Sequence, residues 1–557
     1  ILYRPVKSVL GSAGYGRLNR PGDIQSTRNQ VELGISDSSL PEIHYRRESI
    51  DATSVFLGER SHWVRQRGTT QLDLTPLTPA LRVESEERSI IPTSVDSMKT
   101  GSFRFLEIAP GVSTREISRM TATAELQFRT EDSAATGSLQ HASKSLTQIY
   151  TWRLSGWQSL SSSLALSIRN TDFTDEFKAR GNLNSEVILV RSQSRYSPLQ
   201  RAIESDVFYE FASQRSARLE RIFVRVAQGT GNYRYKGDLN GNGAADENEF
   251  ELTRFDGDYI ILYLPSDRLE PVVDLKSSVR IRLQPARLLG NPSNQFERIL
   301  RAISTETYAR IDEKSKEYDT KQIYLLNFDR FQDARTTISG SNQLTQDLFL
   351  FENDPNLSFR FRFDERKGLL QLVSATERSY LRERSIRVRS QLVPEFGNQT
   401  DFAVKNDRVL ASLPSPRERD LESNSLNTEF SYRPEQQWET AITLGVTNVT
   451  NRLNGQASIA DINEQGTRLV YGLPNVGQLR GELKREEVTL NNITVDPLRP
   501  LPFEFTNGKA VGKTFLWQLA FDYRINQNVQ VSMNYNGRSE GGGSPIHTAR
   551  VEARAFF

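Results

Sequence analysis

One stretch of the sequence has the residue types and spacing needed to bind a hard metal ion. Residues 238–249 read Asp-Leu-Asn-Gly-Asn-Gly-Ala-Ala-Asp-Glu-Asn-Glu. In a calcium loop of this length, oxygen atoms at alternate positions converge on the ion, a glycine at the sixth position reverses the chain, and a final glutamate closes the shell. The ligands predicted by this pattern are Asp238, Asn240, Asn242, the backbone carbonyl of Ala244, Asp246 and Glu249.

The residues on either side of this loop do not favour helices. The segments 229–235 and 259–264 are both rich in β-forming residues, so the loop is expected between strands and not between paired helices. We therefore predict a calcium-loop insertion over 229–264, in which Ca²⁺ has a structural role. The alternative is an Asn- and Gly-rich turn that binds no metal.

The strongest structural signal is the alternation of apolar and polar residues near the C-terminus. It runs through 515–525, 529–536 and 549–557, with short polar or Gly-rich connections between the three segments. Period-2 alternation predicts strands with one apolar and one polar face. In a soluble sandwich the apolar face would pack into a core, whereas in an outer-membrane barrel it would face lipid and the polar face would line a lumen.

Three features favour the barrel. The segments are about ten residues long, which suits a tilted membrane-spanning strand. A short turn at 526–528 alternates with a longer loop around 541–543, as periplasmic turns alternate with outer loops. Aromatic residues lie toward strand ends, where interfacial girdles form. The terminal Phe557 also resembles the C-terminal signal of barrel proteins in the outer membrane of Gram-negative bacteria.

Alternation persists from about residue 118 to the end of the chain, which sets the domain prediction. Residues 1–117 show little sustained alternation and many Pro, Gly and Ser residues, so an irregular N-terminal region is expected, as a plug or as extra strands. Residues 118–557 are predicted to form an all-β fold, a large antiparallel transmembrane β-barrel of roughly 14–22 strands. Closure would place the last strand beside the first barrel strand, near 118–130.

Composition excludes several classes of function. The 71 basic and 69 acidic residues leave a net charge of +2, so no nucleic-acid partner is expected. No apolar stretch is long enough for a membrane-spanning helix. The absence of cysteine excludes disulfides and thiolate chemistry. Because the chain begins at Ile1 without Met, either a leader has been removed or the chain is part of a longer one.

Two segments carry a family resemblance. The region from Gly231-Asn232-Tyr233 through the Asn-Gly-Asn-Gly turn to 258–260, and the final hairpin 537–557, resemble parts of large outer-membrane β-barrel proteins of Bacteroidota-type Gram-negative bacteria. The resemblance covers about sixty residues. Secretion-translocon barrels of the type 9 system are similar in general character. This resemblance implies an outer-membrane location and a role in transport, secretion or a surface assembly.

Three functions are weighed. The first is an integral outer-membrane barrel that acts as a pore, translocon or scaffold component, with the lipid bilayer and other proteins of an outer-membrane complex as partners. The second is a secreted, soluble, calcium-binding surface or adhesin protein. The third is a barrel hydrolase, for which Ser544 and His547 are the nearest candidate pair. Because none of the four histidines lies in a catalytic motif, the chain is not expected to be an enzyme.

Overall fold

The fold is described from a computed structural model. The structure describes residues 2–6, 8–20, 22–36, 40–55, 57–239, 241, 243, 245–290, 294–317, 323, 325–327, 331–412, 415, 417–453, 455, 457–493, 501–526 and 528–555.

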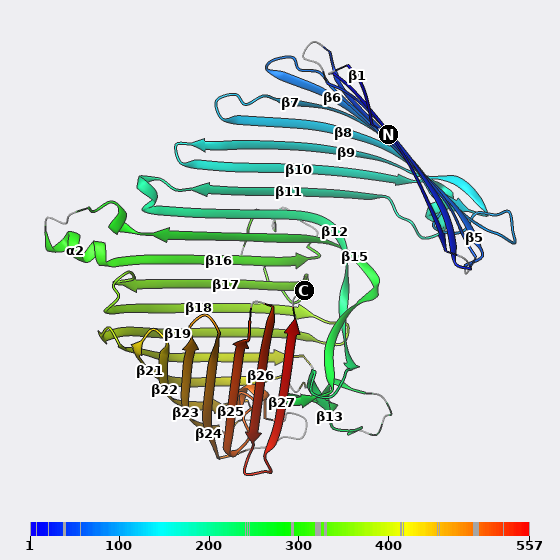
Figure 1. Ribbon diagram of the computed structural model, residues 1–557. Helices are drawn as coiled ribbons and strands as arrows, with labels where there is room; N and C mark the ends of the chain where they lie inside the picture. Colours follow the sequence, from blue (N-terminus) through cyan, green and yellow to red (C-terminus); the bar gives the residue numbers. More distant parts are fainter. Residues whose placement is uncertain are drawn as a thin grey trace. The chain divides into compact units, whose positions relative to one another are not determined.

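The described residues form 27 strands and a few short helices (Figure 1). The strands in the first half of the chain are β1 (Leu2–Val6), β2 (Val9–Arg20), β3 (Ile24–Ile35), β4 (Glu42–Ser54), β5 (Glu59–Gln71), β6 (Leu77–Pro92), β7 (Phe103–Thr114), β8 (Met120–Ala135), β9 (Ser138–Trp157), β10 (Leu160–Phe173), β11 (Ser185–Tyr196), β12 (Ile203–Arg225), β13 (Gly231–Tyr235), β14 (Phe250–Gly257) and β15 (Tyr259–Leu283). Those that follow are β16 (Ile303–Ser315), β17 (Thr337–Leu350), β18 (Leu357–Gln371), β19 (Thr376–Val393), β20 (Phe396–Ala411), β21 (Arg419–Glu435), β22 (Trp438–Asn451), β23 (Ser458–Leu473), β24 (Gly477–Asn491), β25 (Gly512–Arg524), β26 (Val529–Ser539) and β27 (Ile546–Ala555).

The helical elements are α1 (Asp175–Ala179), α2 (Gln295–Ala302), α4 (Phe503–Thr506) and the single turns η1 (Leu199–Arg201), η2 (Glu247–Glu249) and η3 (Pro285–Arg287). Among the described residues, no helix is both long and apolar enough to cross a membrane.

The strands form an antiparallel meander. From β2 to β11, and again from β15 to β27, each strand pairs with the next one along the chain. Further pairings among the described residues join β1 with β2, β12 with β15, and β13 with both β14 and β15. Because neighbouring strands follow directly in sequence, short connections are sufficient to build the sheet.

The chain divides into two compact units. Unit 1 contains residues 1–196 and 206–214, and unit 2 contains residues 197–205 and 215–557. The sheet of unit 1 runs from β1 to β11, and that of unit 2 from β15 to β27. The loop insertion belongs entirely to unit 2.

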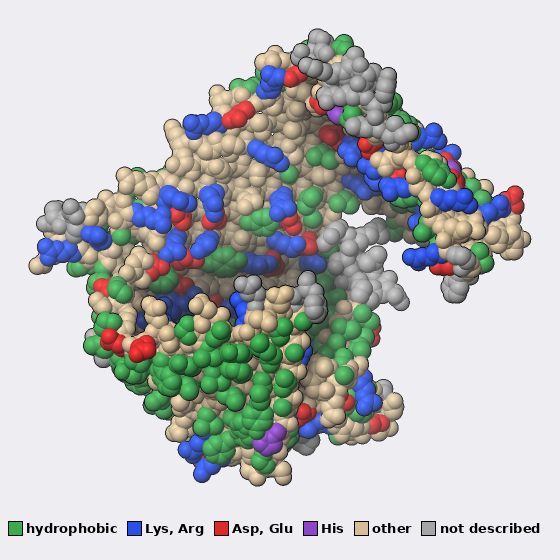
Figure 2. Space-filling model, in the orientation of Figure 1, with side chains coloured by type: hydrophobic (Ala, Val, Ile, Leu, Met, Phe, Trp, Pro, Cys, Tyr) green, Lys and Arg blue, Asp and Glu red, His purple; other side chains and the backbone are tan. Residues whose placement is uncertain are grey.

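In unit 2, register places apolar side chains from successive strands in one row on one face of the sheet. Phe361 pairs with Ile386, Ile386 with Phe402, Phe402 with Leu426, and Leu426 with Val446. All but Phe361 are exposed, and Val446 retains 56% of its accessible surface. The same face continues to the C-terminus through pairs such as Leu483–Trp517 and Met533–Val551. Figure 2 shows hydrophobic side chains gathered over the last strands of the chain.

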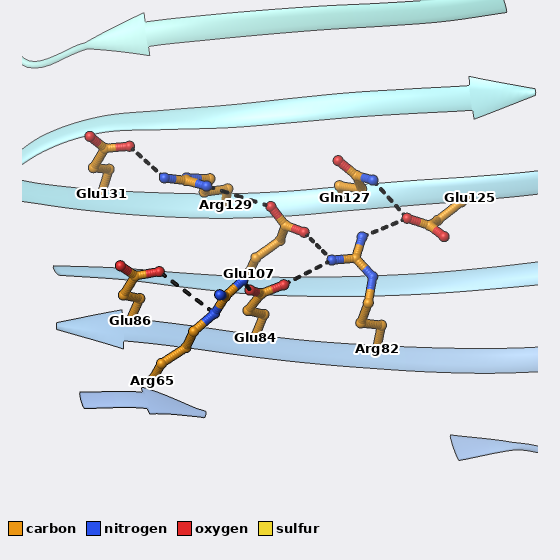
Figure 3. Close-up of polar contacts among 9 residues, drawn as sticks. All are labelled: Arg65, Arg82, Glu84, Glu86, Glu107, Glu125, Gln127, Arg129 and Glu131. Carbon is orange, nitrogen blue, oxygen red and sulfur yellow. Dashed lines mark hydrogen bonds and ion pairs between the residues drawn. The ribbon is translucent and has the colours of Figure 1, made fainter. Parts of the chain in front are cut away.

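Unit 1 has the same two-faced design. Val83, Ile108 and Phe128 are exposed and pair in a row across β6, β7 and β8. On the opposite face, Arg82 lies 2.7 Å from both Glu107 and Glu125, and Arg129 lies 3.1 Å from Glu131. Figure 3 shows that these charged side chains come from neighbouring strands and point toward one another. Opposite charges on adjacent strands therefore neutralise one another on the polar face.

Of the two alternatives expected for residues 1–117, a plug or extra strands, the described residues form extra strands, β1–β7. These strands pair regularly, unlike the irregular conformation expected there, and the expected boundary at 117/118 falls in the turn before β8. Sequence alternation is weak here because both faces of these strands carry many polar residues, as in β2, where eight successive residues are exposed. Hydrogen bonding of the backbone does not require an apolar face.

The strand number of the predicted barrel region agrees with the sequence prediction, whereas its closure does not. Residues 118–557 were expected to form roughly 14–22 strands, and their described part forms 20, β8–β27. The expectation that a strand at 118–130 closes against the last strand was wrong. β8 occupies this position, and both of its edges are already paired, with β7 and with β9. The terminal Phe557 lies outside the described residues.

An apolar patch on the polar face of unit 2 holds the short helix α4. Leu421, Val449, Ile462 and Val488, from four successive strands, are buried there together with Phe505 of α4. Side chains along a strand point to the two faces in turn, and these residues occupy positions of opposite direction to those of the exposed apolar row. They therefore lie on the opposite side of the sheet. The connection between β24 and β25 thus folds back onto the polar face.

We expect Phe505→Ala to detach α4. Phe505 is 1% exposed, and removing a buried phenyl ring from a packed site costs about 3–5 kcal/mol. Guanidinium unfolding of the purified protein measures this loss. Phe515→Ala is the matched control, because Phe515 is 41% exposed on the other face. Equal stability of the two variants would contradict the packing role of α4.

Candidate functional site

The N-terminal half of the predicted calcium loop is wrapped around one carboxylate. Oδ1 of Asp238 accepts a hydrogen bond from the backbone N–H of Gly241 at 2.6 Å, and Oδ2 accepts one from Gly243 at 2.8 Å. Both glycines have left-handed backbone, with φ of +72° and +73°, a conformation that L residues with a side chain rarely adopt. The loop therefore has the tight reversal that the sequence pattern predicted at Gly243.

The C-terminal half of the loop is built on a buried glutamate. Glu249 is 1% exposed, and its Oε1 accepts a hydrogen bond from the N–H of Leu239 at 2.8 Å. Its Oε2 accepts from the N–H of Asp246 at 3.1 Å and from the hydroxyl of Tyr235 at 3.3 Å. Partial burial and the nearby carboxylate of Glu249 raise the pKa of Tyr235, which keeps its hydroxyl protonated as a donor.

The predicted ligands are only partly placed. Asp238, Asp246 and Glu249 occupy one compact turn, and Asp246 and Glu249 form a reciprocal capping box around η2. Asn240, Asn242 and Ala244 lie outside the described residues. Within the described part of the chain, no three acidic or histidine side chains are grouped closely enough to hold a metal. The donor set suits a hard cation, because every predicted ligand atom is oxygen. Calcium binding here stays a prediction.

An aromatic cluster anchors the loop immediately after Glu249. The ring of Phe250 stacks on that of Phe223, with centroids 3.8 Å apart, and contacts the rings of Tyr235 and Tyr259 at 5.1 Å each. Tyr233 packs edge-on against Phe223 at 5.4 Å. These rings come from β12, β13, β14 and β15, so the cluster fixes the base of the insertion to the sheet.

A network of charges joins the insertion to β19. The guanidinium of Arg221, at the end of β12, bonds both carboxylate oxygens of Glu377 at 3.1 and 3.0 Å. It also pairs with Glu247 of η2, inside the calcium loop. Arg417 binds Glu377 from the other side at 2.9 Å. Because the side chain of Arg221 is 3% exposed, the loop and the sheet share one buried cation.

A second pair of contacts holds β14 against β24 and β26. Arg254 lies 2.6 Å from Glu486, which is fully buried and also lies 3.1 Å from Lys484. Arg538 of β26 pairs with Asp256, and its guanidinium lies 4.4 Å from the ring centroid of Phe255. Since Glu377, Glu486 and Arg538 all lie on the polar side of the sheet, the insertion occupies that side of unit 2 (Figure 1).

Two cavities flank the insertion. The first has a volume of about 580 Å³ and is lined by Lys484, Leu516, Asn536 and other residues of the last strands. The second, of about 490 Å³, lies between β14 and α4. Arg254 and Phe255 line both cavities.

The histidine of the candidate pair considered above contacts two aromatic side chains. Nδ1 of His547 lies 2.8 Å from the hydroxyl of Tyr535 on the neighbouring strand, and its ring lies 5.5 Å from that of Trp517. The other three histidines each contact a carboxylate: Glu42, Asp51 and Asp132.

Sequence reasoning identified the loop but missed its docking contacts. Arg221, Arg254 and Glu486 were indistinguishable from the many other charged residues of the strands. One local signal existed. Gly231 and Gly257 flank the insertion, and a Cβ on Gly257 would lie 2.4 Å from the carbonyl oxygen of Gly231. Paired glycines at such positions indicate close backbone approach.

Comparisons with known proteins give distant matches only. No protein-family model and no curated protein matches the chain. A pyoverdine outer membrane receptor, FpvA from Pseudomonas aeruginosa PAO1, is 9% identical over 100% of this chain and 79% of its own, with a TM-score of 0.30. The copper transporter OprC is 9% identical over 99% and 79%, at 0.31. OmpT of Vibrio cholerae is 7% identical over 64% and 98%, at 0.23. Scores this low establish neither a family nor a function for this chain.

We expect the double variant Asp238→Ala with Glu249→Ala to lose calcium-dependent protection of the insertion. Both carboxylates organise the loop, so their removal should expose the backbone between 229 and 264 to protease with or without the ion. Limited proteolysis with mass spectrometry, in calcium and in chelator, measures this. Asp175→Ala, on the exposed helix α1 of unit 1, is the control. A digest of the double variant that still responds to calcium would contradict metal binding by this loop.

Proposed function

We propose that the chain is an integral β-barrel protein of the bacterial outer membrane that acts in transport, as a pore, translocon or scaffold component. The observation that carries this proposal is the two-faced sheet. Rows of exposed apolar side chains cover one face over successive strands, while ion pairs fill the other. Lipid is the environment in which such an apolar face is stable.

The polar face is suited to a water-filled or protein-filled lumen. Arg362 bonds Asp347 through two contacts of 2.8 and 2.7 Å, and Arg387 pairs with Asp401 at 2.5 Å. Such pairs are costly in hydrocarbon but are readily accommodated in a wet interior. Because an open sheet edge is not tolerated within lipid, the proposal requires every strand edge at membrane depth to be paired in the mature assembly. Other proteins of an outer-membrane complex are proposed partners.

The calcium loop has a structural role in this proposal. Ca²⁺ would supply positive charge to the carboxylates of Asp238, Asp246 and Glu249, and would hold the loop closed. Two side chains also hold the loop in place: Phe250 anchors its base, and Arg221 connects it to β19.

The second candidate is a secreted, soluble surface or adhesin protein with the same calcium loop. Its apolar faces would need a protein cover. In the described part of the chain the side chains of the row from Ile386 to Val446 remain exposed, which favours the membrane protein. The resemblance of the insertion and of the final hairpin to large Bacteroidota-type outer-membrane proteins supports the same choice.

We expect the protein to remain in the membrane fraction after carbonate and high-salt washing, and to show heat-modifiable mobility on gels. Both properties follow from a hydrogen-bonded sheet that is embedded in lipid. Release of the folded protein into the wash would contradict the proposal and would favour the secreted alternative.

We also expect substitutions to distinguish the two faces of β22. Leu444→Arg places a charge on the apolar face and should destabilise the membrane-inserted protein by about 2–4 kcal/mol. Thr443→Arg, one residue earlier on the polar face, should cost far less. Unfolding from lipid vesicles in guanidinium measures both. Equal costs at the two positions would show that the face containing Leu444 does not contact lipid.

A further inference from the structure

Four arginines lie together on the polar face of β18 and β19 in unit 2. Arg360 and Arg362 are two residues apart on β18, and Arg387 and Arg389 are two residues apart on β19. Register pairs Arg360 directly with Arg387, so the Cβ atoms of these two cationic side chains lie about 4.5–5.5 Å apart. All four side chains point away from the exposed apolar row that begins at Phe361, because neighbours along a strand alternate between the two faces.

Carboxylates compensate only two of these four charges. Arg362 and Arg387 are each bonded to an aspartate of a neighbouring strand, at distances of 2.5–2.8 Å. Arg389 instead donates a hydrogen bond from its Nε to the uncharged amide oxygen of Gln399 at 3.0 Å. This part of the wall therefore carries more positive charge than its own contacts neutralise.

Arg360 is the least compensated of the four. Its Nε is buried and has no hydrogen-bond partner, and no carboxylate pairs with its guanidinium in the part of the chain that the structure describes. Register explains the absence, because Arg360 lies opposite Arg387 on one side and opposite Phe349 on the other. Like charges that face each other on adjacent strands destabilise a sheet. A bound anion would remove this repulsion.

We propose that Arg360, Arg387 and Arg389 form a binding site for a small solute that carries an oxyanion, a phosphate or carboxylate group. A guanidinium is planar and donates two parallel hydrogen bonds, which match two oxygen atoms of either group. Ser358 lies two residues before Arg360 and pairs with Arg389, and its small side chain leaves room for the anion between them. The inference rests on the proposed transport function and specifies the class of solute as anionic.

The first test titrates the purified, folded protein with inorganic phosphate, at an ionic strength held constant with potassium chloride. Phosphate should raise the midpoint of urea unfolding, because a ligand that binds only the folded protein stabilises it. Arg360→Gln should weaken this binding roughly tenfold or more, since a charge-assisted hydrogen bond is lost. In the absence of phosphate, the variant should be at least as stable as the wild type, because one member of a like-charge pair is gone.

Arg366→Gln is the matched control. Arg366 lies on the same face of the same strand, but it is paired with Asp364 at 2.9 Å. Its removal should leave the response to phosphate unchanged.

Ser358→Glu provides the opposite test. A carboxylate fixed at this position would lie beside Arg360 and Arg389, so it should raise stability without phosphate and abolish the response to phosphate. Succinate, titrated in the same way, distinguishes a carboxylate-binding site from one that accepts phosphate alone. A response to either anion that is lost in Arg360→Gln supports the site.

Equal responses of the wild type and Arg360→Gln, or no response of the wild type to either anion, would overturn the site. These measurements use folded protein and leave its membrane location aside. Release of the protein by carbonate and high-salt washing would instead overturn the proposed function itself.

Discussion

The strict alternation of side chains along antiparallel strands is the constraint on which the rest of this structure depends. In an antiparallel pair of strands, the side chains of two paired residues lie on the same face of the sheet. The row from Phe361 to Val446 therefore crosses five strands on one face. A slip of one residue would exchange the two faces. The ion pairs on the polar side, such as Arg362 with Asp347, then hold each strand against its neighbours in the same register.

Two parts of the polar face contact segments that fold back onto the sheet. Leu421, Val449, Ile462 and Val488 make one such place, which α4 covers through Phe505. The surroundings of Glu377 and Glu486 make another, to which the insertion is joined. The sheet thus provides separate docking positions, one apolar and one charged, for two connections that leave its strands.

Sequence reasoning recovered what depends on local pattern. The strands of the C-terminal third were predicted from alternation alone, and the reversal at Gly243 followed from its position in the loop. What it missed depends on distant partners. Strands such as β2 and β3 have too few apolar residues to produce a periodic signal, yet their backbones pair regularly. The contact of Arg254 with Glu486 joins residues 232 positions apart, and no local feature marks either one.

Many ion pairs on the strands join residues two apart on one strand, as in Arg129 with Glu131, Arg310 with Asp312, and Arg554 with Glu552. Each of these pairs is neutral by itself before its strand meets a neighbour. The compensation of the two charges therefore does not depend on which strand lies beside them, and it is set by the sequence of one strand alone.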